Sequence, residues 1–174
     1  ANMTNMFLNT SALSNANRGL MQESFSSKPN WPYDWRQHVV IDDSNFQTAV
    51  NLWVSNQADA NATYGHISNW NTSAVTDMSN AFRYRTNFNE NISGWDMSNV
   101  TKMTFMFYEA TSFNQPIGTW DVSSAQQMND MFSRSFSFNQ DLKDWNVSSV
   151  TNMRNMFNRA TNFNQSIGNW DVSS

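Results

Sequence analysis

The sequence contains no cysteine, which excludes disulfide bonds and zinc–thiolate sites. Proline and glycine are scarce as well, with three and five among 174 residues. Acidic residues outnumber basic ones, because fourteen Asp and Glu against ten Lys and Arg leave a net charge of −4. Phosphate backbones are recognised by clustered positive charge. We therefore expect no nucleic-acid partner.

Signals for membranes and export are also missing. The sequence has no apolar run of 18 residues, no secretory signal pattern and no lipidation motif. We expect that this segment does not insert into a membrane, and that any targeting signal lies outside it or was cleaved. The lack of cysteine is compatible with export, because a core built by stacking does not need disulfide bonds.

Residues suited to catalysis are few. His38 and His66 are the two histidines, and Asp34, Asp42 and Asp43 lie near His38 in the sequence. No HExxH motif, glycine-rich phosphate loop or nucleophile elbow is present. We therefore expect that the protein is not an enzyme, has no catalytic residues and uses no cofactor.

A repeat of 25 residues dominates what the sequence does contain. Its clearest mark is an unbroken tryptophan column, formed by Trp70, Trp95, Trp120, Trp145 and Trp170. Three further columns each keep one residue type, and they are formed by Met78, Met103, Met128 and Met153, by Phe82, Phe107, Phe132 and Phe157, and by Asn89, Asn114, Asn139 and Asn164. In a stacked array, each column is a line of side chains along the axis.

Two periodicities alternate within one unit. Apolar residues from Val150 to Ala160 follow a spacing of three, three, one and three, which predicts a helix of about three turns. Trp170 and Val172 are two residues apart, as in a short strand, and Gly168 precedes them at a bend. The pattern predicts an α/β fold: a leucine-rich-repeat-like solenoid with one short strand and one helix in each 25-residue rung, and a helical cap before the regular array.

The chain divides into four segments on this basis. Residues 1–13 match the helical half of a repeat, with Met3, Met6, Phe7 and Leu13 in phase with the columns. Residues 14–43 are rich in Asn, Ser and Pro and are expected to be an irregular insertion or linker. Residues 44–65 show helical spacing and are expected to cap the array. Residues 66–174 hold the regular repeats.

The two ends of the sequence complement each other. The chain begins with the helical half of a repeat and stops after the Trp170 half of one. The first interpretation is that the chain is a segment of a longer tandem protein or a subunit that joins head to tail into a filament, with itself as the partner. The second interpretation is that the chain is a trimmed piece.

Polar columns have structural and functional interpretations. Asp96, Asp121 and Asp171 either cap the predicted helices or line up oxygens for calcium, and capping is favoured because Asn71 and Asn146 interrupt the column. The Asn column is expected to satisfy backbone groups of its own rung and the next. The Trp column is expected to pack in the core, since a row of exposed indoles would instead be a platform for sugar rings.

Asn-x-Ser/Thr sequons are frequent in this sequence and mark candidate N-glycosylation sites. They begin at Asn2, Asn9, Asn61, Asn71, Asn91, Asn99, Asn146 and Asn164. Because the chain is so rich in Asn, Ser and Thr, the number of sequons is only modestly above chance.

The repeat resembles the 25 to 26-residue repeats of bacterial surface proteins, which are related to BspA-like leucine-rich repeats. The resemblance covers residues 1–13 and 44–174. It rests on the motifs Trp120-Asp121-Val122-Ser123, Val150-Thr151-x-Met153-x-x-Met156-Phe157, Phe163-Asn164-Gln165-x-Ile167-x-x-Trp170 and Phe46-Gln47-x-Ala49-Val50-x-x-Trp53. Such repeats occur on mycoplasma and other bacterial surfaces, so the resemblance implies an extracellular or cell-surface protein whose role is poorly defined.

Two classes of function follow from the sequence. The first is a structural protein of a surface appendage, filament or sheath that assembles end to end. The second is an adhesin or recognition module that binds a host protein or a glycan. In the second case, the contacts are expected to come from variable surface residues such as Arg83, Tyr84, Arg85, Tyr108 and Glu109.

Overall fold

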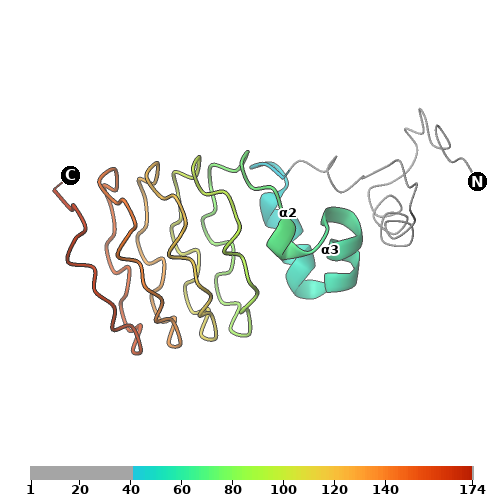
Figure 1. The fold of residues 1–174 in the computed structure, drawn as a ribbon. Coiled ribbons are helices and arrows are strands. Elements are labelled where there is room, and N and C mark those ends of the chain that lie inside the picture. Colours follow the sequence, from blue (N-terminus) through green and yellow to red (C-terminus); the bar gives the residue numbers. More distant parts are fainter. Residues whose placement is uncertain (1–40, 174) are drawn as a thin grey trace, which may run out of the picture.

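A stack of 25-residue turns of the chain, preceded by two helices, makes up the part of the protein that the structure describes (Figure 1). The computed structural model describes residues 41–173. Within them α2 spans Phe46–Ser55, α3 spans Gln57–Tyr64 and the short 3-10 helix η2 spans Ile67–Asn69. The expected partial repeat at 1–13 and most of the expected insertion at 14–43 lie outside the described residues.

Each 25-residue turn, called a coil below, lacks the helix and the strand that the sequence predicts. Among residues 41–173 the only helical elements are α2, α3 and η2, and parallel pairing is limited to isolated bridges such as Asp77 with Lys102. The leucine-rich-repeat-like α/β prediction is therefore wrong. The coils nevertheless stack in register, since Lys102 also pairs with Gln127, and Gln127 with Asn152.

The alternation of backbone hydrogen bonds explains why no helix forms between positions 78 and 85. The amides of Met78, Asn80, Phe82 and Tyr84 donate to carbonyls of the next coil, over 2.8–2.9 Å. Of the amides between them, those of Ala81 and Arg83 donate to the carbonyl three residues back, at 3.2 and 3.1 Å, and that of Ser79 donates to the Asp77 side chain. Every second amide is thus committed to a neighbouring coil, whereas an α-helix uses its interior amides internally.

Left-handed backbone at two positions per coil makes this alternation possible. Asn80 and Tyr84 have φ of 63° and 61°, and the corresponding residues of the following coils have φ between 56° and 60°. These residues are Phe105, Glu109, Asp130, Arg134, Asn155 and Arg159. A positive φ interrupts right-handed helix geometry, and it costs a non-glycine residue about 1–2 kcal/mol. The linked turns keep helix-like spacing of the apolar residues, which is why the periodicity was misleading.

The predicted strand at Ile167–Val172 is replaced by turns. The Trp170 amide donates to the Ile167 carbonyl at 3.1 Å, and the same bond recurs at Trp95, Trp120 and Trp145. A bond between residues three apart closes a β-turn. The spacing of Trp and Val by two residues therefore arises from a chain that bends around the core.

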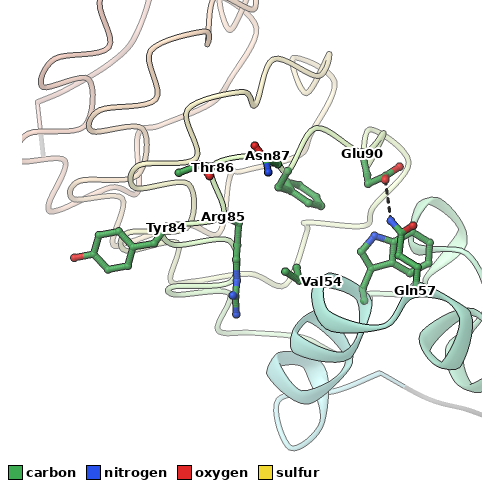
Figure 2. A pocket seen from close by; sticks show the side chains of 9 residues that line it. Val54, Gln57, Tyr84, Arg85, Thr86, Asn87 and Glu90 are labelled. Carbon is green, nitrogen blue, oxygen red and sulfur yellow. Dashed lines mark hydrogen bonds between the residues drawn. The ribbon is translucent and has the colours of Figure 1, made fainter.

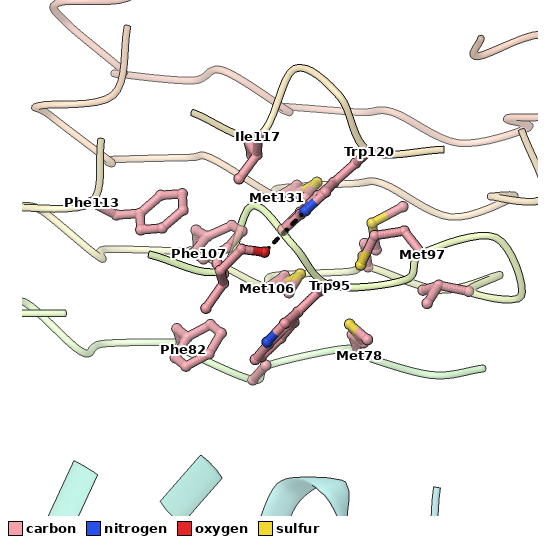
Figure 3. Close-up of a cluster of buried hydrophobic side chains, with 14 of the residues drawn as sticks. Met78, Phe82, Trp95, Met97, Met106, Phe107, Phe113, Ile117, Trp120 and Met131 are labelled. Atoms are coloured by element: carbon pink, nitrogen blue, oxygen red, sulfur yellow. Dashed lines mark hydrogen bonds between the residues drawn. The ribbon is translucent and has the colours of Figure 1, made fainter. Parts of the chain in front are cut away.

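The core is a set of aromatic and methionine columns that run along the stack. Phe82, Phe107 and Phe132 are fully buried, and successive ring centroids are 5.5 Å apart in nearly parallel planes. Trp120 and Trp145 are stacked as well, with ring centroids 6.4 Å apart. Figure 3 shows Trp95 and Trp120 beside the phenylalanine column. Offset stacking of aromatic rings is favourable beyond the area that it buries. The columns therefore add side-chain packing to the contacts between coils.

The helices α2 and α3 cover the first coil (residues 76–100), at the end of the stack opposite to the C-terminus (Figure 1). Phe46 is buried and meets Trp95 edge-on, with ring centroids 5.7 Å apart. Asn56 begins α3 by accepting a hydrogen bond from the Asp59 amide at 3.2 Å. Gly65 follows α3 with φ of 76°, a value that glycine adopts readily. No helix among the described residues has both the length and the apolarity needed to cross a bilayer.

Two glycines at the same position of different coils give a test of the stacking. A Cβ at Gly118 would collide with the Asp141 carbonyl of the next coil, whereas a Cβ at Gly168 would meet nothing within 4 Å. We expect Gly118→Ala to lower the free energy of unfolding by about 1–3 kcal/mol. Gly168→Ala should leave it unchanged within about 0.5 kcal/mol. Urea unfolding followed by circular dichroism measures both, and equal effects would contradict the stacked arrangement.

Candidate functional site

The tryptophan column lies in the core and does not form an exposed platform. Trp70, Trp95, Trp120 and Trp145 are 3–4% exposed, and Trp170 is half-buried. The indoles of Trp120, Trp145 and Trp170 each donate a hydrogen bond to a carbonyl of the preceding coil, and that of Trp95 donates to the Ile67 carbonyl in η2, at distances of 2.8–3.2 Å. The indoles therefore tie neighbouring parts of the stack together, and a sugar ring has no access to the four that precede the last coil.

The methionine and phenylalanine columns are buried until the last coil (residues 151–173). Met78, Met103 and Met128 are fully buried, like the phenylalanines beside them. Met153 and Phe157 in the last coil are partly exposed, although they pack against the core. The difference arises because no further coil among the described residues covers them.

The asparagine column is a continuous hydrogen-bonded ladder. The side-chain oxygen of Asn89 accepts from the Asn114 amide at 2.9 Å and from Gln115 Nε2 at 3.0 Å. The same pair of bonds links Asn114 to the next coil, and Asn139 to the one after it. The amide side chains thus satisfy backbone groups of the next coil at the turn where the chain reverses.

The aspartate column forms local turns, because there is no helix to cap. Asp96 and Asp121 each accept hydrogen bonds from the amide and the hydroxyl of the serine two residues later, at 2.6–3.1 Å. These hydroxyls, followed by the amides, lower the pKa of both carboxyls from the usual 3.8. Asn71 and Asn146 make the same turn without the charge. Within 41–173, no group of three or more acidic or histidine side chains is arranged to hold a metal ion.

At the end of the stack that the helices cover, the Asp43 carboxylate accepts the hydrogen bonds that a backbone carbonyl of a preceding coil accepts elsewhere. Its Oδ1 accepts from the amides of Thr76 and Asp77 at 2.7 and 3.1 Å. In the next coil, the amides of Thr101 and Lys102 both donate to a backbone carbonyl, that of Thr76. Burial raises the pKa of Asp43, but the hydrogen bonds from Thr76 and Asp77 outweigh this effect and hold the pKa below 3.8.

Most of the candidate glycosylation sites among the described residues lie outside helices, at the surface. Asn71, Asn91, Asn99, Asn146 and Asn164 are exposed, and Asn61 on α3 is half-buried. The side chains of Asn71, Asn91 and Asn146 accept hydrogen bonds from the serine of their own sequons. Asn2 and Asn9 lie outside the described residues. Glycosylation of these sites stays a prediction.

Arginine and aromatic side chains gather along one edge of the stack. The Arg83 guanidinium lies 4.7 Å from the Phe105 ring centroid and 4.8 Å from that of Tyr84. Tyr84 in turn meets Tyr108 edge-on at 5.4 Å. In the coil beyond, Arg134 pairs with Glu109 at 2.7 Å. Four of the five residues suggested by the sequence as contacts thus lie close together, and two of them, Tyr84 and Glu109, have left-handed backbone.

The fifth, Arg85, lines a pocket of about 370 Å³ between the cap helices and the first coil (Figure 2). Trp53, Val54 and Gln57 come from the helices, while Arg85 and Glu90 come from the coil. Gln57 Nε2 donates to Glu90 Oε1 at 3.1 Å across the junction. The sequence reasoning missed this pocket, because the helical residues that line it belong to no repeated column.

His66, the histidine within the described residues, is exposed and bonds to its own neighbour. Its Nδ1 lies 2.8 Å from Ser68 Oγ, and its ring meets Trp53 edge-on at 4.9 Å. These contacts place it at the start of η2, where it shares no site with a carboxylate. His38 and Asp34 lie outside the described residues.

Comparison with protein families gives a match over most of the described residues. Residues 53–170 fit the family described as "Mycoplasma protein of unknown function, DUF285". The chain belongs to this family. It is a surface-associated repeat family, and the finer likeness to BspA-like repeats is not part of the match. Neither the curated proteins nor the solved structures give a match to the chain.

The asparagine ladder predicts a position-dependent effect of removing one amide. Asn114→Ala deletes the acceptor for the Asn139 amide and for Gln140 Nε2, and should lower the free energy of unfolding by about 1 kcal/mol. Asn164→Ala is the matched control, because no side chain or amide among the described residues bonds to its side-chain oxygen. Urea unfolding of both variants tests this, and a larger loss for the control would contradict it.

Asp43 predicts a loss of stability in acid. Its pKa is lower in the folded chain than the usual 3.8, so its stabilising effect is present above pH 3.8 and is lost as the pH falls further. Asp43→Ala should therefore destabilise the protein at pH 7, and the difference from wild type should shrink below pH 3.8. Urea unfolding at a series of pH values measures this. Asp144→Ala, at an exposed position, is the control, and a difference independent of pH would contradict the assignment.

Proposed function

We propose that the chain is a non-enzymatic structural repeat protein of the cell surface, which assembles end to end with copies of itself. Its membership in a surface-associated family supports the location. The observation that carries the assembly is the uncovered face of the last coil. The proposal involves no cofactor and no catalytic residue.

The uncovered face of the last coil is apolar. Val172 is 62% exposed, whereas Val147 at the same position one coil earlier is 1% exposed. Phe157 and Trp170 are partly exposed here, although their counterparts in the preceding coils are buried. A hollow of about 640 Å³ lies on this face, lined by apolar residues that include Met153 and Ile167. Burying this surface would contribute about 25 cal/mol for each Å² of apolar area.

The same face carries a row of unused backbone donors. The amides at Met153, Asn155, Phe157 and Arg159 correspond to amides that donate to the next coil everywhere else in the stack. No acceptor for these four amides occurs among the described residues. An exposed row of unpaired amides is a template on which another chain can pair. The face thus presents both the ends of the apolar columns and a row of unpaired amides at a regular spacing.

The sequence of residues 1–13 fits what this face requires. Asn2-Met3-x-Asn5-Met6-Phe7 repeats the pattern Asn152-Met153-x-Asn155-Met156-Phe157. The sequence of a second copy therefore carries the Met and Phe residues at the spacing that one more coil needs. We take residues 1–13 of the next copy as the occupant of the uncovered face.

A recognition module for a surface protein or glycan is the second candidate. It is favoured by a segregation of charge, because all five arginines among the described residues fall at positions equivalent to 79–85 of the first coil. Only two acidic residues, Glu109 and Asp130, occupy equivalent positions. An acidic chain with one basic, aromatic edge is suited to an anionic partner.

Mixing two blocked variants tests the assembly. Phe157→Asp puts a charge on the uncovered face, and Phe7→Asp puts one on the matching segment. Each variant alone should sediment as a monomer, and an equimolar mixture should form dimers only, because each copy keeps one intact end. The unmodified chain should form longer assemblies as its concentration rises. Sedimentation velocity measures all four samples.

Phe136→Asp is the matched control, because Phe136 is 44% exposed but lies in the coil before the last. It should assemble like the unmodified chain. An unmodified chain that stays monomeric at every concentration would overturn the proposal. So would a mixture of the two blocked variants that gives no dimer while both variants keep their circular dichroism spectra.

A further inference from the structure

The pocket between the cap helices and the first coil carries a basic side chain on one side and an acidic one on the other. Figure 2 shows Arg85 on one side, the Gln57–Glu90 pair on the other, and Val54 between them. Thr86 and Asn87 complete the wall on the coil. Its volume of about 370 Å³ is within the range of small-molecule sites. Its lining residues come from the cap helices and the first coil. These elements lie at the end of the stack away from the uncovered face (Figure 1).

Arg85 brings a charge that has no carboxylate partner among the described residues. Its one hydrogen bond runs from Nη2 to the side-chain oxygen of Asn51, at 2.9 Å. A guanidinium has five N–H donors, so most of them stay unused. Such a group binds a carboxylate through two parallel hydrogen bonds. The Asn51 contact holds the side chain against α2 and so reduces the entropy lost on binding.

Trp53 adds an unsatisfied donor. The indole is 3% exposed and lines the pocket, and its Nε1 has no hydrogen-bond partner. Every other indole among the described residues donates to a backbone carbonyl. A buried N–H without an acceptor is destabilising by about 1–3 kcal/mol. An oxygen-rich ligand seated against Trp53 can satisfy this donor after a small shift of the side chains around it.

The rest of the lining is suited to hydroxyl groups. Glu90 is an acceptor for hydroxyl donors, while the Thr86 and Asn87 side chains are exposed and make no hydrogen bond among the described residues. Val54, which is 39% exposed, and Phe88 supply apolar contact for C–H groups. A ligand that matches this lining has one carboxylate, several hydroxyl groups and one apolar C–H face. An acidic pyranose has all three features.

We propose that this pocket binds a carboxylated sugar, such as a hexuronate unit of a glycan. Arg85 holds the carboxylate, Glu90, Thr86 and Asn87 bind the hydroxyls, and Val54 contacts the C–H face. The site goes beyond the structural role and does not depend on it, because the uncovered face and the pocket lie at opposite ends of the stack.

Two probes that differ only in the carboxylate test the site. Methyl β-glucuronide and methyl β-glucoside are titrated into the full-length Phe157→Asp chain at low salt, and binding is followed by calorimetry and saturation-transfer NMR. We expect the glucuronide to bind at least about tenfold more tightly, as the loss of one charge-assisted contact implies. Arg85→Gln should abolish this preference and leave glucoside binding unchanged. Trp53→Phe should weaken the binding of both sugars by a similar factor.

Arg159→Gln is the matched control, since it removes an arginine from the same edge but far from the pocket, and it should keep the full preference. Equal binding of the two sugars would overturn the proposal, as would a preference that survives Arg85→Gln. Binding of zwitterionic dialanine in place of either sugar would also overturn it and would assign the pocket to a peptide terminus. These outcomes are separate from assembly, because the Phe157→Asp background is used throughout.

Discussion

The backbone hydrogen bonds between coils are the constraint on which the rest of the structure depends. At each junction, four amides spaced two residues apart donate to the next coil, as those of Met103, Phe105, Phe107 and Glu109 do over 2.8–3.1 Å. An α-helix would leave none of these donors free for a neighbour, and stacking would then rest on side chains alone. Because the coils are joined through the main chain, their side chains must fall in columns. The 25-residue period is therefore a consequence of the hydrogen-bond register.

This arrangement needs left-handed residues, and the sequence carries part of the signal for them. The column at Asn80, Asp130 and Asn155 holds the residue types that adopt positive φ most readily, with Phe105 as the exception. The column at Tyr84, Glu109 and Arg134 gives no such signal, because bulky side chains rarely adopt this backbone. Periodicity alone could predict stacking and the buried positions. It could not separate a helix from linked turns, because both place apolar residues three or four apart on one face.

The side-chain ladders were more predictable than the backbone. A column of Asn at a turn and a column of Trp beside Val have few physical roles, and the structure places the first in hydrogen bonds between coils and the second in the core. The pocket was not predictable, because Trp53, Val54 and Gln57 belong to no repeated column. From the sequence, Arg85 was named only as a variable surface residue, and it departs from a column that holds Ala110, Ser135 and Ala160. This departure puts the only large charged group of its column at the junction with the cap helices.

The two ends of the stack therefore differ in kind. At the covered end, residues outside the repeat satisfy the first coil. The Asp43 carboxylate takes the place of a backbone carbonyl, and α2 and α3 bury the aromatic columns. At the other end, the described chain shows a regular coil whose amides and columns continue the pattern. Regular repeats can only offer surfaces that match further repeats, whereas an irregular cap can combine unlike side chains such as Trp53, Arg85 and Glu90 in one place. Within this architecture, chemical specificity is therefore expected at the cap, and self-complementarity at the regular face.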